Sequence, residues 1–441
     1  RIGKCLILFA LPMIAGNLLQ QFYNIADTLI VGRVLGKNAL AAVGSAYTLM
    51  TFLTSVFLGL SMGSGALFSI YKGKGSDREL RLSVVHAFGL IMGVTVLLNV
   101  LVYLFTDPIL WFLRVPEEVY DGMKTYLLVI FAGLVATSLY NFFSCLLRAL
   151  GNSTVPLVFL AVSAVLNIGL DLLFVAVLPW GIKGAAIATV ISQIVSGIGI
   201  CIYTWMKMPE LRFSLRPERI KESQSVMGEV VRYSAASSIQ QSVMNFGILM
   251  VQGLVNSFGA TVMAAFAAAV KIDSFAYMPA QEFANAFSIF ISQNRGAGKE
   301  KRVQKGVRSA VTVSAAFCIC ASVLIYFGAR YLMLAFIDGS EHEIIRVGIQ
   351  YLHIEGAFYC GIGILFLWYG YYRAVGRPEM SVVLTVISLG TRVLLSYTLA
   401  PIKSIGVIAI WWSIPIGWFL ADVTGYVYLQ YMNKKAKMCR N

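Results

Sequence analysis

Carboxylates and amides inside otherwise apolar segments are the residues whose types and spacing could do chemistry. Gln20, Asn24 and Asp27 stand at positions i, i+4 and i+7 of one apolar run, so they share one face of a helix. Asn167 and Asp171 are four residues apart in another run and also share a face. An ionised group at mid-bilayer costs roughly 2.5–3.5 kcal/mol, so each carboxylate needs a partner or a function. Oxygen ligands suit a hard cation such as Na⁺, and low dielectric lets a carboxylate carry a proton. We therefore expect a cation or proton site here, although the amides could equally serve only as hydrogen bonds between helices.

A second set of polar residues lies in the apolar runs of the C-terminal half. Lys271 either pairs with an acid across a cavity or extends its ammonium group toward water. Glu355 is either a second protonation or substrate-charge site, or a partner of Arg392 or Lys271. Arg392 is expected to be a structural counter-ion. The residues expected to line a substrate cavity are Gln20, Asn24, Gln240, Gln241, Lys271, Asp273, Glu282 and Glu355.

The elements that must hold these residues are membrane-spanning helices. Of the 441 residues, 58% are hydrophobic and 13% are charged, and the mean hydropathy is +0.77. Apolar runs of about 20 residues are long enough to cross a bilayer, and a helix satisfies its own backbone in lipid. We expect an all-α integral membrane protein with twelve spans, near 5–32, 40–69, 84–105, 125–147, 155–178, 185–206, 234–256, 262–292, 309–329, 347–371, 380–400 and 405–431.

The basic residues report orientation. The net charge is +14, yet the lysines and arginines fall in short loops between apolar runs, so nucleic acid is not expected as a partner. With the N-terminus in the cytoplasm, 25 of them lie on the cytoplasmic side and eight lie outside. Cytoplasmic loops are enriched in Lys and Arg, so we expect both termini to be cytoplasmic in a plasma (inner) membrane.

The two halves of the chain repeat. Residues 37–42 and 69–75 have counterparts at 260–265 and 292–298, and residues 148–151 return at 373–376, with nearly the same offset throughout. An even number of spans in each half inserts both halves the same way up. We expect two six-helix bundles, residues 1–206 and 233–441, joined by a cytoplasmic linker, residues 207–232. They should be related by a pseudo-two-fold axis along the membrane normal, with a cavity between them.

Enzymatic chemistry has no candidate residues. The glycine-containing turns at 72–75 and 295–298 lack the P-loop pattern, and there is no HExxH or nucleophile elbow. The seven cysteines have no CxxC spacing and indicate neither disulfides nor metal ligands. We expect neither an enzyme nor a cofactor.

Several ordered motifs across the whole chain resemble the multidrug and toxin extrusion (MATE) transporters. They are Leu11-Pro12, Gln20-Gln21-Phe22-Tyr23-Asn24, Ala26-Asp27-Thr28, Arg148-Ala149-Leu150-Gly151-Asn152, Asn167-x-x-x-Asp171, Gln293-Asn294-x-Gly296-Ala297-Gly298 and Pro415-x-Gly417-Trp418. The resemblance implies a secondary active exporter of organic, often cationic compounds. Such an exporter works by alternating access in exchange for Na⁺ or H⁺, and we expect it to act as a monomer. A flippase for a lipid-linked precursor, from the same wider superfamily, is the alternative. A channel or receptor is disfavoured by the internal repeat.

The resemblance also implies site residues. The positions matching the family's first-half cation site are Asp27, Asn167, Asp171 and Thr189, with Tyr140 near them, and Na⁺ is expected at Asp27, Asn167 and Asp171. The pattern is most similar to the DinF-like branch. Gln240 and Gln241 stand where the NorM-like branch carries a glutamate, so a NorM-style site in the second half is not implied.

Overall fold

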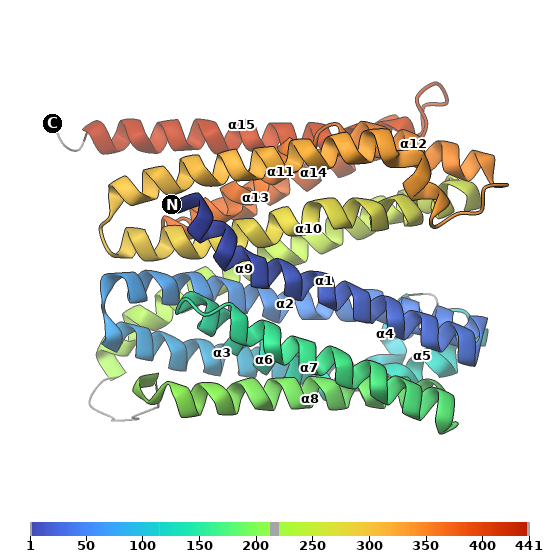
Figure 1. Cartoon of the computed structure of the whole chain (residues 1–441), viewed down its shortest axis with the longest axis horizontal. Helices are drawn as coiled ribbons and strands as arrows, with labels where there is room; N and C mark the ends of the chain where they lie inside the picture. The colour runs from blue at the N-terminus through green and yellow to red at the C-terminus, as the bar shows by residue number, and fades with distance from the viewer. Residues whose placement is uncertain (1, 114, 212–219, 439–441) are drawn as a thin grey trace. The chain divides into compact units, whose positions relative to one another are not determined.

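The computed structural model describes residues 2–113, 115–211 and 220–438, and in these ranges the regular structure is helical throughout. The chain divides into two compact units (Figure 1). The N-terminal unit is Leu11–Gln241, and the C-terminal unit combines Ser242–Asn441 with Arg1–Ala10. The helices α1 (Ile2–Leu35) and α9 (Ile220–Asn256) each cross from one unit to the other.

The N-terminal unit contains most of α1, the first part of α9 and every helix between them. These are α2 (Lys37–Lys74), α3 (Asp77–Leu104), α4 (Thr106–Phe112), α5 (Glu117–Ile130), η1 (Phe131–Gly133), α6 (Leu134–Ala149), α7 (Thr154–Asp171), η2 (Leu172–Val177), α8 (Gly181–Lys207) and η3 (Pro209–Leu211). Glycines let the helices of this bundle approach closely. A Cβ atom on Gly63 of α2 would lie 2.1 Å from the Tyr233 carbonyl oxygen of α9. Next to this contact the hydroxyls of Ser64 and Ser234 are 2.6 Å apart. Small residues at such crossings are typical of helices that pack inside a membrane.

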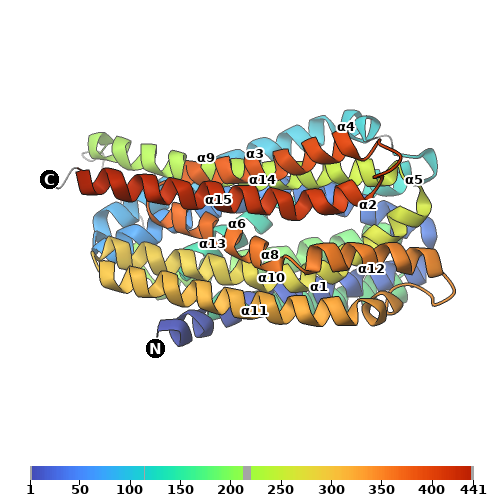
Figure 2. The same ribbon diagram turned by 90° about the horizontal axis from the view of Figure 1, so that it is seen from above.

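The C-terminal unit contains the remaining helices. They are the second part of α9, then α10 (Ala260–Gly296), α11 (Glu300–Leu334), α12 (His342–Gly356), α13 (Tyr359–Ala374), α14 (Pro378–Leu399) and α15 (Ile408–Met438). In Figure 2, α14 and α15 run side by side. Their contact again depends on a glycine, because a Cβ atom on Gly417 would lie 2.4 Å from the Ser388 carbonyl oxygen.

Ten helices of the described ranges are long and apolar enough to cross a membrane. The pair α12 and α13 passes the same test together, with a bend of 53° between them. The span expected at 347–371 is therefore one broken span, and the one expected at 125–147 is interrupted by the 3₁₀ turn η1. The span expected at 234–256 falls in α9, which has 37 residues but is not among these ten helices.

The expected linker, residues 207–232, overlaps two helical segments. It holds the short η3 turn, and α9 is already helical from Ile220. The N-terminal unit includes α9 as far as Gln241, beyond the expected boundary at residue 232. Residues 212–219 lie outside the described residues, as do some of the basic residues counted for orientation: Arg1, Arg114, Arg212, Arg216, Arg219 and Arg440.

Candidate functional site

A pair of carboxyl groups marks the candidate site of the N-terminal unit. Asp27 lies in the second half of α1, and Asp171 is the last residue of α7, just before the π-helical turn η2. Asp171 is fully buried, with 0% of its surface exposed. The two side chains lie next to each other and interact directly. Wide turns of this kind interrupt α-helices at functional sites, and this one separates Asp171 from the rest of its span.

Within the described residues the pair has no hydrogen-bond donor. Both oxygens of Asp171 and the Oδ1 atom of Asp27 are buried and accept no hydrogen bond. Ionised carboxylates only accept, so two of them cannot bond to each other. An uncompensated buried charge is also costly. The arrangement therefore favours one positive charge at the pair, either a proton on one carboxyl group or a cation between the two.

Asn167 and Thr189 supply further oxygen atoms close to the pair. Asn167 lies one turn before Asp171 on α7 and is 2% exposed. Its Nδ2 atom donates to the Thr189 Oγ1 atom of α8 at 3.2 Å, and that hydroxyl donates to the Ala185 carbonyl at 3.1 Å. The Asn167 Oδ1 atom receives no hydrogen bond in the described part of the chain. Its lone pairs remain available to a hard cation.

Two tyrosines that were not expected from the sequence lie near the acid pair. Tyr126 of α5 is buried within electrostatic range of both Asp27 and Asp171. Tyr23, one turn before Asp27, interacts with Gln20. The one available signal for Tyr126 was the repeat, since the offset that relates residues 148–151 to 373–376 also relates Tyr126 to Tyr351.

Three of the expected polar residues contact other helices of the N-terminal unit, and Tyr140 also lies within electrostatic range of Tyr23. The Tyr140 hydroxyl donates to the Pro156 carbonyl at 2.8 Å, in the first turn of α7. Asn24 Nδ2 donates to the Tyr47 hydroxyl of α2 at 3.5 Å. Gln241 Nε2 lies 3.7 Å from the sulfur of Met62, also on α2.

Gln240 is more buried than its neighbour. It is 2% exposed, and its Oε1 atom accepts no hydrogen bond from the described residues. It lies on the part of α9 that packs against α2, and among the described residues no hydrogen bond links it to the acid pair. A direct part for Gln240 in a substrate site stays a prediction.

The C-terminal unit contains a second acid pair. Asp273 of α10 and Glu355 of α12 are 4% and 3% exposed, and their side chains interact. The Tyr351 hydroxyl donates to the Asp273 Oδ2 atom at 3.5 Å, and the Tyr359 side chain also interacts with Asp273. Arg392 of α14 lies within electrostatic range of both acids.

The structure distinguishes the two expected partners of Glu355. Arg392 is the cation near it, whereas the side chain of Lys271 is exposed and its carbonyl oxygen accepts a hydrogen bond from Ser274. Glu282 is half-buried on the same helix as Asp273. The buried acids of the C-terminal unit thus have a guanidinium group within electrostatic range.

No group of three or more His, Cys, Asp or Glu side chains that could hold a metal ion occurs in the described ranges. The expected Na⁺ ligands at Asp27, Asn167 and Asp171 are different in kind, because they are two carboxylates with one amide oxygen. The six described cysteines are free thiols, namely Cys5, Cys145, Cys201, Cys318, Cys320 and Cys360.

Comparison with known proteins shows the family. The MatE family model matches residues 12–173 and 234–398. The chain is 31% identical to the probable multidrug resistance protein YpnP of Bacillus subtilis over 436 residues, covering 98% of this chain and 96% of the relative. It is 26% identical to the probable multidrug resistance protein NorM of Thermotoga maritima, over 93% of this chain and 88% of the relative. A FAD transporter of Shewanella oneidensis is 24% identical over 97% of this chain and 94% of the relative.

Solved structures show the same fold. An outward-facing MATE family transporter of the MOP superfamily matches with a TM-score of 0.89 at 20% identity, covering 98% of this chain and 96% of that one. The Vibrio cholerae MATE transporter VcmN, in its bent form, matches with a TM-score of 0.86 at 22% identity, over 99% and 98% of the two chains. The expected all-α fold with twelve membrane-spanning helices in two bundles is confirmed. The chain belongs to the MATE family of membrane transporters and is not an enzyme.

Proposed function

We propose that this protein is a secondary active multidrug exporter that moves organic, often cationic compounds out of the cell in exchange for Na⁺ or H⁺. The observation that carries the proposal is the Asp27–Asp171 pair, in which both oxygens of Asp171 and the Oδ1 atom of Asp27 are buried and lack hydrogen-bond donors among the described residues. The names of the relatives from Bacillus and Thermotoga support drugs as the class of compound that is transported. A lipid flippase is not favoured by these relatives.

The acid pair supplies a physical route to exchange. One cation or proton at Asp27 and Asp171 offsets their charge, and Asn167 with Thr189 adds neutral oxygens beside it. Coupling requires only that the ion and the substrate change each other's affinity, and that effect is reciprocal by thermodynamic necessity. If the pair favours one conformation when loaded and the other when empty, the ion gradient drives alternating access.

An accumulation assay in cells that lack their own exporters tests the proposal. Wild-type protein should lower the uptake of a fluorescent organic cation, and collapse of the Na⁺ or proton gradient should abolish the effect. Asp171→Asn should leave uptake at the level of cells without the transporter, since the change removes charge but keeps shape. Asp338→Asn is the matched control, because Asp338 is an exposed acid whose Oδ1 accepts hydrogen bonds from Ser340 of its own turn.

The outcomes separate the parts of the proposal. Full export by Asp171→Asn would show that the acid pair is structural. Export that ignores both gradients would overturn secondary coupling. FAD belongs in the substrate panel because one relative is named for it. Export of FAD without organic cations would replace the proposed substrate class and leave the coupling site untouched.

We propose further that the protein acts as a monomer in the plasma membrane with both termini in the cytoplasm. The distribution of basic residues supports this orientation. In a variant without native cysteines, Ser76→Cys should be protected from an impermeant thiol reagent in intact cells, and Glu118→Cys should react. The reverse pattern would invert the orientation of every loop.

A further inference from the structure

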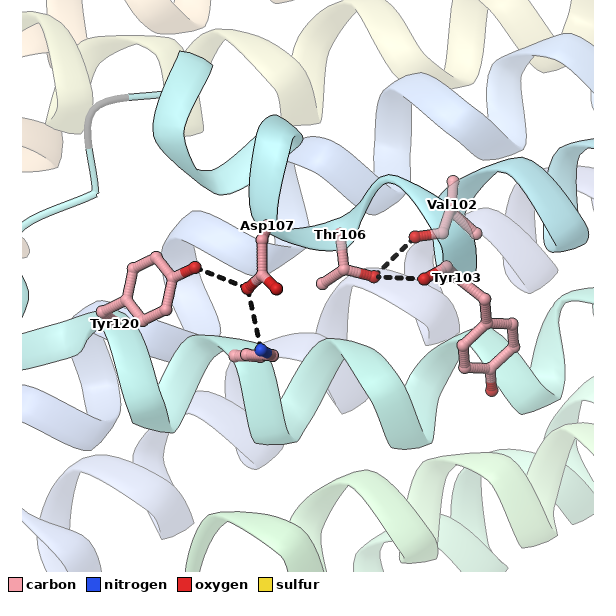
Figure 3. A network of polar contacts seen from close by, with 6 residues as sticks. Val102, Tyr103, Thr106, Asp107 and Tyr120 are labelled. Carbon is pink, nitrogen blue, oxygen red and sulfur yellow. Dashed lines mark hydrogen bonds and ion pairs between the residues drawn. The ribbon is translucent and has the colours of Figure 1, made fainter.

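The helix α4 lies between the ends of two candidate spans and is outside both. Those spans are Asp77–Leu104 and Glu117–Ala149, so this seven-residue helix belongs at the boundary between hydrocarbon and headgroups. The Thr106 hydroxyl donates to the Val102 carbonyl at 2.6 Å and joins α4 to the end of α3 (Figure 3). Trp111 is 79% exposed, and tryptophan is enriched at this depth of a membrane.

Three side chains form a polar cluster beneath α4. The Lys124 Nζ atom lies 2.8 Å from Asp107 Oδ1, and the Tyr120 hydroxyl donates to the same oxygen at 2.6 Å (Figure 3). Hydrogen bonding from Lys124, followed by that from Tyr120, holds the pKa of Asp107 below its usual range. The Lys124 and Asp107 side chains are 36% and 60% exposed. Asp107 is thus an ionised and accessible acid near neutral pH.

Asp107 and Lys124 can each form further hydrogen bonds. Tyr120 and Lys124 both contact Asp107 at its Oδ1 atom, and the Oδ2 atom accepts no hydrogen bond from the described residues. Lys124 has three N–H donors, of which the ion pair uses one. The cluster can therefore accept from a ligand at one atom and donate to it at another.

A hollow of about 810 Å³ adjoins these atoms. It is lined by Asp107, Pro108, Leu110, Trp111, Val115 and Tyr120. Its volume falls in the range of small-molecule sites, and its wall is apolar except at the cluster. A molecule that fits must carry charge of both signs at one end and hydrocarbon at the other.

We infer that this hollow binds a zwitterionic phospholipid with a primary ammonium headgroup, the phosphatidylethanolamine class, drawn from the surrounding bilayer. The ammonium group donates to Asp107 Oδ2, the phosphate accepts from Lys124, and the chains lie along Pro108 and Trp111. A choline headgroup has no N–H to donate, and an anionic lipid without an amine, such as phosphatidylglycerol, brings no cation for Asp107. The site shares no residue with the acid pair, and it stands or falls independently of the proposed transport function.

Lipid retention measures the selectivity. The purified full chain is exchanged into mixed micelles with equal amounts of phosphatidylethanolamine and phosphatidylcholine, and bound lipids are counted by native mass spectrometry. Wild-type protein should retain phosphatidylethanolamine about three- to five-fold more than phosphatidylcholine, the scale of one exposed charged hydrogen bond. Asp107→Asn and Lys124→Gln should each bring the ratio close to one. The matched controls Asp338→Asn and Lys403→Gln, which change exposed charges in the C-terminal unit, should keep the wild-type ratio.

A headgroup series tests the inference without any mutation. Ethanolamine, N-methyl, N,N-dimethyl and choline lipids lose one N–H at each step while keeping their charge. Retention by wild-type protein should fall along the series, most at the last step, where no donor is left. Equal retention of the four lipids would overturn the inference. So would an unchanged ratio in folded Asp107→Asn protein.

Discussion

The two units bury similar acid pairs but compensate them differently. Asp27 and Asp171 of the N-terminal unit have amide and hydroxyl neighbours, whereas Asp273 and Glu355 of the C-terminal unit have Arg392. The repeat makes the comparison direct, because Arg392 occupies the position in the second half that corresponds to Asn167 in the first. By the same offset Tyr351, which contacts the second pair, corresponds to Tyr126, near the first.

This difference predicts different functions for the acid pairs of the two units. A buried acid pair with a guanidinium group nearby has part of its charge offset by the protein itself. A pair with only neutral neighbours depends on a charge from outside, which can arrive from one side of the membrane and leave on the other. We therefore expect ion coupling in the N-terminal unit and a structural part for the acids of the C-terminal unit.

The largest expected effect is on the first pair. Asp27→Asn and Asp171→Asn should each abolish nearly all export, because the proposed ion bridges both groups and needs both. The double variant should then be little worse than either single one, since the shared interaction is lost only once. Transport rates for the four members of this cycle decide the matter. Partial losses that multiply would indicate two separate sites.

The second effect concerns the stability of the C-terminal unit. Arg392→Gln removes the cation within electrostatic range of two buried carboxylates, and we expect a loss of about 1–3 kcal/mol. Thermal unfolding in detergent should show the loss, and Asp273→Asn in the same chain should restore part of it. Arg346→Gln is the control, because the side chain of Arg346 is 77% exposed in its ion pair with Glu343. An unchanged melting temperature for Arg392→Gln would mean that the acids are compensated in another way.

Helix periodicity predicted the shared faces, and tertiary contacts decided which faces meet. Asn167 and Asp171 were expected together because they are one turn apart, and the family resemblance added Thr189, which contacts Asn167. Lys271 is close to Asp273 in sequence, yet the cation within range of that acid is Arg392, from a helix much later in the chain. Spacing along one helix cannot show which neighbouring helix supplies the partner.

The breaks within the spans could also not be predicted from the hydropathy pattern. The bend between α12 and α13 leaves the apolar run uninterrupted, so composition gave one straight span. Glu355 lies in the last turn of α12 and Tyr359 begins α13, so this break brings both residues to Asp273. The π-helical turn after Asp171 was hidden in the same way, because its residues, Leu172–Val177, are all apolar. Backbone irregularity inside an apolar run leaves no mark on composition.

A smaller effect separates the paired tyrosines. Tyr126→Phe should lower export about ten-fold while leaving the melting temperature unchanged, because the hydroxyl acts beside a group that changes its charge. Tyr351→Phe should lower the free energy of unfolding by about 1 kcal/mol, which is the usual contribution of one hydrogen bond. The same change should leave export nearly intact. Parallel transport and unfolding measurements compare the two variants. The same phenotype for both would contradict the division of labour between the units.

The smallest expected effect is on the stability contributed by an exposed ion pair, which can be compared with that of the buried acids. Asp107 and Lys124 form an ion pair in the N-terminal unit, and the pKa of Asp107 is lowered by that contact. A lowered pKa in the folded state adds stability at pH values above the unfolded pKa of about 3.9. That stability is lost as the pH falls through the lower, folded value. In micelles without phosphatidylethanolamine, acidification from neutral pH should thus cost wild-type protein slightly more stability than it costs Asp107→Asn.

Because the side chains of Asp107 and Lys124 are both well solvated, the difference should be far smaller than the effect of Arg392→Gln. If the two effects were of similar size, burial would not be what distinguishes the acid pairs, and the contrast between the units would need another cause.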